Sequence, residues 1–126
     1  MNTAAPVLQT LGSPLGGWSG GTIATGTYHL TGMVIFSGTP RWIVETLTIS
    51  DAGVGVYDLE AVVAEGPTNP PGPLGHGNAT LTVTGSNTAT QVITCGDSGS
   101  LDYAFETDGS TLVLESSTFR ATAERQ

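Results

Sequence analysis

The chain has 126 residues, of which 38% are hydrophobic, enough for one domain with a single buried core. Three arginines and no lysine stand against eleven carboxylates, and the resulting net charge of −8 repels nucleic acid and anionic membrane surfaces. We therefore expect no nucleic-acid partner. We also expect no membrane insertion, because no apolar run reaches transmembrane length.

The residue types favour β structure along the whole chain. Twenty threonines and 18 glycines suit solvated strands and tight turns, and no stretch of ten or more residues has the 3.6-residue period of a helix. Eight segments instead alternate apolar and polar residues, which places every second side chain on one face of a strand. The predicted strands span residues 22–37, 41–50, 54–65, 78–84, 88–95, 100–107, 111–116 and 118–125.

Most connections between these strands are short. Asp108-Gly109 is the strongest two-residue hairpin signal, whereas residues 65–77 contain four prolines and form the one long loop. We expect the first strand to bend or bulge where Gly26 and Gly32 interrupt it.

Short connections predict that neighbours in sequence are neighbours in space. Eight strands in such a meander can close into a barrel, which removes exposed sheet edges. The predicted fold is all-β, an eight-stranded antiparallel up-and-down barrel; a two-sheet β-sandwich is the alternative, although Greek-key sandwiches need longer cross-connections. We expect residues 1–17 to be a flexible N-terminal leader and residues 18–126 to form the single β-barrel domain.

The apolar positions of the alternation are expected to face the barrel interior, and the first strand contributes Tyr28, Leu30, Val34 and Phe36. An apolar lumen with a few hydroxyls suits a small hydrophobic ligand, but it is equally compatible with a filled core. A ligand site predicts a cavity above roughly 300 Å³. The side chains expected to bind a ligand are those of Tyr28, Phe36, Glu45, Tyr57, Gln91, Tyr103 and Phe105.

Two polar residues interrupt the inward pattern. Glu45 and Gln91 share the parity of their apolar neighbours. A carboxylate in an apolar lumen has a raised pKa and can act as an acid, a base or an anchor for a ligand cation. Alternatively, this strand presents Trp42 and Val44 to the interior, or Glu45 forms an ion pair with Arg120 or Arg125.

Other site chemistry has little support in the sequence. Cys95 is the only cysteine, and its parity favours a small buried side chain. Residues 96–99 spell GDSG, the string around the nucleophile of chymotrypsin-like serine proteases, but the chain is too short for the two barrels of those enzymes. His29 and His76 stand far apart without a Cys or Asp cluster, so we expect no metal, and no nucleotide-binding motif indicates a cofactor.

One pattern resembles a known family. Gly16-Gly17-Trp18 before the first strand, together with an arginine near the end of the last strand, resembles the calycin pattern of lipocalins. Residues 26–31, Gly-Thr-Tyr-His-Leu-Thr, are similar to the opening of small lipocalin-like domains in exported bacterial proteins, particularly myxobacterial ones. The resemblance covers about residues 16–125 and implies a barrel plugged by Trp18 beneath Arg120 or Arg125. The chain lacks the usual disulfide and C-terminal helix of the family.

Three functions are compatible with these observations. The first is a non-catalytic barrel that binds a hydrophobic or aromatic small molecule in its lumen. The second is a structural or assembly module that self-associates through its N-terminal arm. The third is a barrel cyclase or isomerase that uses Glu45 as its acid or base. The lysine-free composition suits a bacterial protein that acts outside the cytoplasm, and the sequence leaves monomer and homo-oligomer open.

Overall fold

The structure of the chain, a computed structural model, describes residues 4–95 and 99–126. Within this part, no helix is long and apolar enough to cross a membrane. The regular elements described there are β1 (Val7–Leu8), β2 (Thr10–Leu11), β3 (Gly26–Ile35), β4 (Trp42–Gly53), β5 (Val56–Gly66), β6 (Gly75–Val83), β7 (Thr88–Cys95), β8 (Ser100–Thr107), β9 (Thr111–Glu115) and β10 (Phe119–Arg125).

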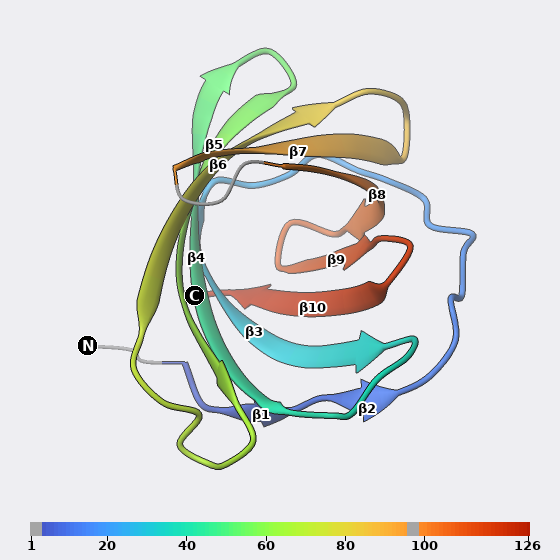
Figure 1. Cartoon of the computed structure of the whole chain (residues 1–126). Helices are drawn as coiled ribbons and strands as arrows, with labels where there is room; N and C mark the ends of the chain where they lie inside the picture. Colours follow the sequence, from blue (N-terminus) through green and yellow to red (C-terminus); the bar gives the residue numbers. More distant parts are fainter. Residues whose placement is uncertain (1–3, 96–98) are drawn as a thin grey trace.

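Eight of these strands, β3 to β10, form a closed barrel (Figure 1). From β4 to β10 each strand pairs antiparallel with the next one in sequence. β10 then pairs with β3, and β3 pairs with β4, which completes the ring. The ring confirms the predicted all-β, antiparallel up-and-down barrel. The two-sheet sandwich is wrong, because hydrogen bonding continues around the whole ring.

The strand boundaries differ from prediction by three residues or more at three places. β4 continues to Gly53 instead of ending at residue 50, because it pairs with β5 up to the turn. β6 begins at Gly75, inside the segment expected to be the long loop, because the prolines end at Pro73 and leave the following backbone free to pair. β3 begins at Gly26 instead of residue 22, since the residues before it belong to a separate connecting segment.

That segment, residues 12–25, is called the strap here, and it runs along one end of the barrel to reach β3 (Figure 1). Gly20 N donates to Phe105 O at 2.8 Å, and Thr107 N donates to Gly20 O at 2.9 Å. Gly20 has φ +77°, and a Cβ there would lie 1.8 Å from Ser86 O, so only glycine fits. Ile23 at 3% exposure adds its side chain to the core.

A bulge in β3 changes which of its residues face inward. Leu30 pairs with Ala123, but after a register shift Met33 pairs with Ala121. Both alanines line the barrel interior, and directly paired residues share a face of the sheet. Met33 therefore faces inward, and the expectation for Val34 is wrong because the extra residue reverses the alternation.

The segment Val7–Leu11, called the arm here, fills a gap in the barrel wall. β3 and β4 pair only over residues 26–29 and 46–49. Beyond that stretch, β1 pairs antiparallel with β4 and β2 pairs parallel with β3. The arm lies within the residues that we expected to be a flexible leader, and its two-residue strands are too short for alternation to reveal.

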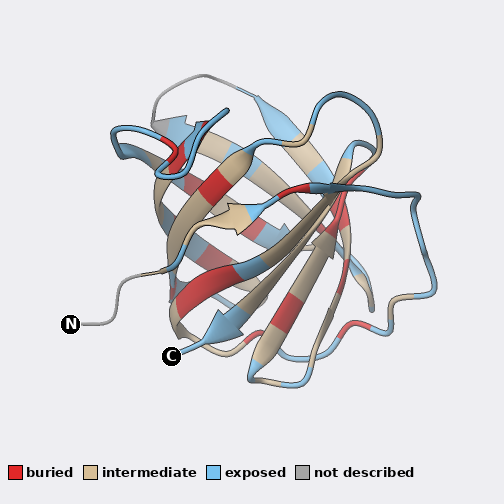
Figure 2. Cartoon of the chain, turned by 90° about the horizontal axis from the view of Figure 1, so that it is seen from below, coloured by how far each residue is buried: buried red, intermediate tan, exposed pale blue. Residues whose placement is uncertain are grey.

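The core fills only one half of the barrel. Figure 2 shows buried residues at intervals along the strands, separated by more exposed ones. Along β4–β7 the side chains of the main core cluster lie toward the β4–β5 and β6–β7 turns, for example Ile49, Tyr57 and Leu81. The buried core consists of Ile23, Tyr28, Ile49, Tyr57, Leu59, Ala79, Leu81, Ala89, Tyr103, Phe105 and Leu112.

Candidate functional site

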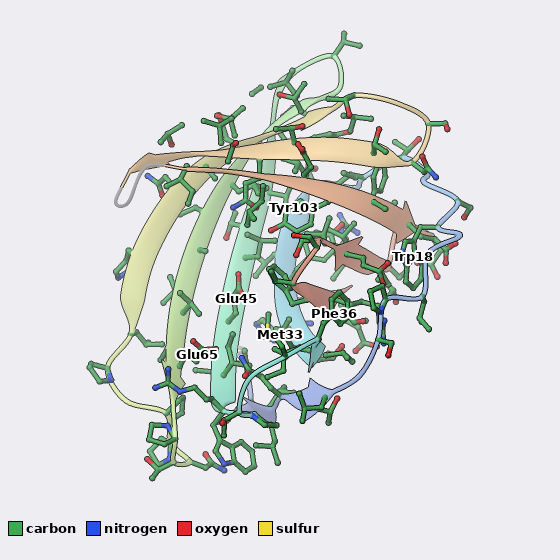
Figure 3. The ribbon with its side chains drawn as sticks, turned by 45° about the vertical axis from the view of Figure 1, so that its right-hand side comes forward. Trp18, Met33, Phe36, Glu45, Glu65 and Tyr103 are labelled. Atoms are coloured by element: carbon green, nitrogen blue, oxygen red, sulfur yellow. The ribbon has the colours of Figure 1, made fainter. Side chains whose placement is uncertain are left out.

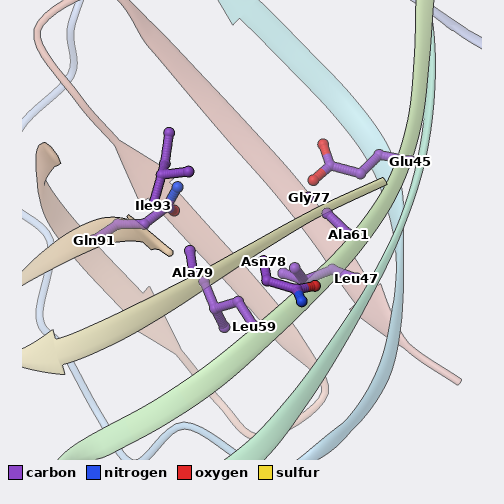
Figure 4. A pocket seen from close by; sticks show the side chains of 9 residues that line it. All are labelled: Glu45, Leu47, Leu59, Ala61, Gly77, Asn78, Ala79, Gln91 and Ile93. Carbon is purple, nitrogen blue, oxygen red and sulfur yellow. The ribbon is translucent and has the colours of Figure 1, made fainter. Parts of the chain in front are cut away.

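The other half of the barrel contains a cavity of about 160 Å³, which we call the lumen cavity (Figure 4). On β4 it lies beside Glu45 and Leu47, whereas the core residue Ile49 lies nearer the turn. On β7 it lies beside Gln91 and Ile93 in the same way. The complete lining consists of Glu45, Leu47, Leu59, Ala61, Gly77, Asn78, Ala79, Gln91 and Ile93.

Small residues create this space. Ala61 pairs with Gly77 across β5 and β6, and Ala79 follows on the same face. A Cβ built on Gly77 would meet no heavy atom within 4 Å, so this inward position is open space. In the packed half, the corresponding positions of the same strands carry Tyr57 and Leu81. The change from large to small side chains along β5 and β6 is therefore the sequence feature that leaves a cavity.

A second, smaller space of about 40 Å³ lies on the opposite side of Glu45 and Leu47, and its lining is otherwise aliphatic. Both spaces share these two residues, so Glu45 stands between them. The lining of the second space consists of Leu30, Glu45, Leu47, Leu112, Leu114, Ala121 and Ala123.

The Glu45 side chain points from β4 into the lumen, with Gln91 on the far side of the cavity (Figure 4). Burial among apolar side chains raises the pKa of the Glu45 carboxyl above its ordinary value of 4.5, because the charged form loses its hydration. Among the described residues, the salt bridges are Arg41–Glu65 and Arg120–Glu115. The ion pair of Glu45 with Arg120 or Arg125 that the sequence left open is therefore not formed among the described residues. The inward position of Glu45 excludes the alternative strand orientation.

Tyr103 of β8 is the titratable neighbour of Glu45 in the lumen (Figure 3). Burial, and then the negative charge of Glu45, raise the pKa of the Tyr103 hydroxyl to about 12. The hydroxyl is therefore neutral at physiological pH and can both donate and accept a hydrogen bond. The ring packs edge-on against Phe119, with centroids 6.0 Å apart, so its position is set by packing.

The seven residues predicted to bind a ligand separate into three groups. Glu45 and Gln91 line the lumen cavity. Tyr28, Tyr57, Tyr103 and Phe105 belong to the packed core, and Tyr103 is the one among them whose pKa responds to Glu45. Phe36 follows β3 beyond the bulge and lines neither space. The cavity is also smaller than the expected 300 Å³, because the aromatic side chains fill the other half of the barrel.

Sequence reasoning missed a polar group on the arm. Gln9 is 4% exposed, and its amide Nε2 donates to Glu65 Oε2 and contacts Met33 Sδ at 3.4 Å. Its Oε1 accepts from Arg41 N at 3.0 Å, and its own N donates to Arg41 O at 2.9 Å. Figure 3 shows Met33 and Glu65 below Glu45. No periodic signal marks Gln9, because its role depends on the separation of β3 and β4.

The residues of the calycin-like pattern are connected through a carboxylate. Glu115 accepts from Leu15 N at 3.0 Å and Gly16 N at 3.1 Å, and Arg120 contacts it at 3.3 Å. Burial alone raises the pKa of Glu115, but these hydrogen bonds and the nearby Trp18 outweigh it and lower the pKa. Within the described residues, the recorded aromatic contact is Tyr103–Phe119, so the expected stacking of an arginine on Trp18 is not formed.

Two further sequence features, the GDSG string and the two histidines, add no site within the described residues. The GDSG string includes residues 96–98, and these residues, like the side chain of Cys95, lie outside the described part. Among the described residues, no group of three His, Cys, Asp or Glu side chains is arranged to hold a metal ion.

The fold and the cavity define a small closed antiparallel barrel with a partly hollow lumen, an architecture compatible with lipocalin-like proteins. Comparison with models of known families, with curated proteins and with solved structures found no match to this chain.

Proposed function

We propose that the chain is a lipocalin-like barrel that binds a small hydrophobic or aromatic molecule in the lumen cavity without transforming it. The single observation that carries the proposal is the placement of small residues at the inward positions of β5 and β6, which leaves about 160 Å³ among mostly apolar residues, with Glu45, Asn78 and Gln91 as the polar part of the lining. A dry cavity of about 150 Å³ is large enough for benzene. An unfilled core is destabilising, and a ligand that fills it offsets that cost.

Toluene tests this proposal by NMR titration of the methyl groups. We expect saturable shifts of Leu47, Ala61 and Ala79, which line the cavity, and none of Val54, which is fully exposed. Gly77→Val fills the cavity and should weaken binding by about tenfold or more. His76→Val places the same side chain on the exposed face of β6 and should leave binding unchanged. Equal shifts in all three proteins, or no saturable shift, would overturn the proposal.

A specific observation also favours a second candidate, a barrel isomerase or cyclase. The raised pKa of Glu45 suits a general acid or base, and Tyr103 supplies a neutral hydroxyl near it. Native mass spectrometry of protein from its own host distinguishes the two functions. A retained molecule that stays unchanged on prolonged incubation supports binding alone, whereas conversion that stops in Glu45→Gln supports catalysis.

A further inference from the structure

We propose that the lumen ligand is a small cationic amine, whose ammonium group pairs with Glu45 while its apolar part fills the lumen cavity. The inference rests on the proposed binding function and adds the chemical class of the ligand.

The protein provides no cation for Glu45. All three arginines of the chain contact the N-terminal segment or its partners: Arg41 is 3.9 Å from Glu65, Arg120 pairs with Glu115, and Arg125 donates to Thr25 O at 2.7 Å. With no lysine in the sequence, the described residues that line the two spaces include one carboxylate, Glu45, and no positive side chain. Glu65 lies on the same face two pairs further along β5, where Gln9 and Arg41 contact it. A half-buried carboxylate among mostly apolar side chains is costly until a cation accompanies it.

The groups that face Glu45 suit an ammonium ion. β7 contributes the Gln91 amide, whose oxygen is an acceptor, to the cavity lining. Tyr103 of β8 belongs to the adjacent core, close enough for the charge of Glu45 to raise its pKa. Among the residues that line the two spaces, Glu45 is the one titratable group. The remaining neighbours on β3, β5, β6, β9 and β10 carry no charge: Leu30, Leu59, Ala61, Gly77, Asn78, Ala79, Leu112, Leu114, Ala121 and Ala123.

Charge also excludes the other common class of small apolar ligand. A fatty acid or another anion would bring a second carboxylate beside Glu45 in a chain of net charge −8. The volume of about 160 Å³ limits the apolar part to the size of a single ring or a short alkyl chain. A primary amine attached to one ring satisfies both limits.

Three matched probes test the inference: toluene, benzyl alcohol and benzylamine, titrated by NMR into the full chain at about pH 7. We expect benzylamine to bind more tightly than benzyl alcohol by about tenfold or more, because an ion pair in an apolar site exceeds a neutral hydrogen bond. Glu45→Gln should remove this preference while retaining toluene binding. Gln91→Leu should weaken benzylamine but not toluene.

Acidification provides an independent readout. Protonation of Glu45 removes the ion pair, so benzylamine binding to the wild-type protein should weaken from about pH 7 to about pH 4, while toluene binding should not. Toluene binding without a preference for benzylamine, or a preference that survives in Glu45→Gln, would overturn the amine and leave the hydrophobic site standing. Failure of all three probes would overturn the site itself.

Discussion

At the scale of single residues, Glu45 is a carboxylate placed where its charge is expensive. Its pKa is raised by burial, so the folded protein retains a proton that the unfolded chain releases. The free energy of unfolding should therefore fall as pH rises from the ordinary value of 4.5 through the raised folded pKa. A residue that lowers stability in the empty protein indicates a functional constraint on this position.

Glu45→Gln removes this pH dependence. We expect the variant to be more stable than the wild-type protein at about pH 7 and equally stable at about pH 4, as measured by urea unfolding. Glu60→Gln on the exposed face of β5 is the control and should change the unfolding free energy by less than about 0.5 kcal/mol at both pH values. A Glu45→Gln protein that is less stable at neutral pH would show that the carboxylate stabilises the fold.

The parity of the sequence identified Glu45 and Gln91 as inward polar residues, because period two fixes direction along a strand. Parity does not report volume, so it could not distinguish the filled half from the hollow half. The signal was present in the side-chain sizes: Ala61, Gly77 and Ala79 occupy adjacent inward positions once the strand pairing is known. That pairing is a tertiary fact, so the sequence alone does not separate aromatic residues of the packed core from residues that line the cavity.

At the scale of elements, the arm shows what alternation cannot predict. Its strands contain two residues each, and they form because β3 and β4 separate beyond His29 and Thr46 and leave unpaired backbone groups. The same strand β3 carries the bulge that turns Met33 inward in place of Val34. Glycine at position 32 indicated a bend, but the direction of its effect depends on the register with β10.

Gln9 is the residue that attaches the arm to the barrel. Gln9→Ala leaves Arg41 N without its acceptor and Glu65 without its donor, so we expect a loss of about 1–3 kcal/mol in unfolding free energy. Thr10→Ala, which changes an exposed side chain of the same arm, should cost less than about 0.5 kcal/mol. Urea unfolding at neutral pH measures both. Similar values for the two variants would mean that the arm is held by its backbone pairing alone.

At the scale of the whole molecule, one half of the barrel is packed and stabilises the fold, whereas the other half is partly hollow. One half contains the packed core and the strap, which Ile23 joins to that core, and the other contains the lumen cavity. The arginines attach the N-terminal segment instead of entering the lumen: Arg120 also donates to Ser13 O at 3.1 Å. This distribution of charge leaves Glu45 without a protein cation.

The division predicts a gradient of local stability along individual strands. Backbone amides near the core should exchange with solvent more slowly than amides beside the cavity, because opening the packed half exposes more apolar surface. On β4 the comparison is Ile49 with Glu45, and on β6 it is Leu81 with Gly77. We expect about tenfold slower hydrogen exchange at the core positions, measured by NMR.

Saturating toluene should slow exchange beside the cavity and reduce the difference, because a ligand bound only to the closed state stabilises it by mass action. Equal exchange rates along each strand, with or without toluene, would mean that the barrel opens as one unit and that the cavity does not weaken it locally.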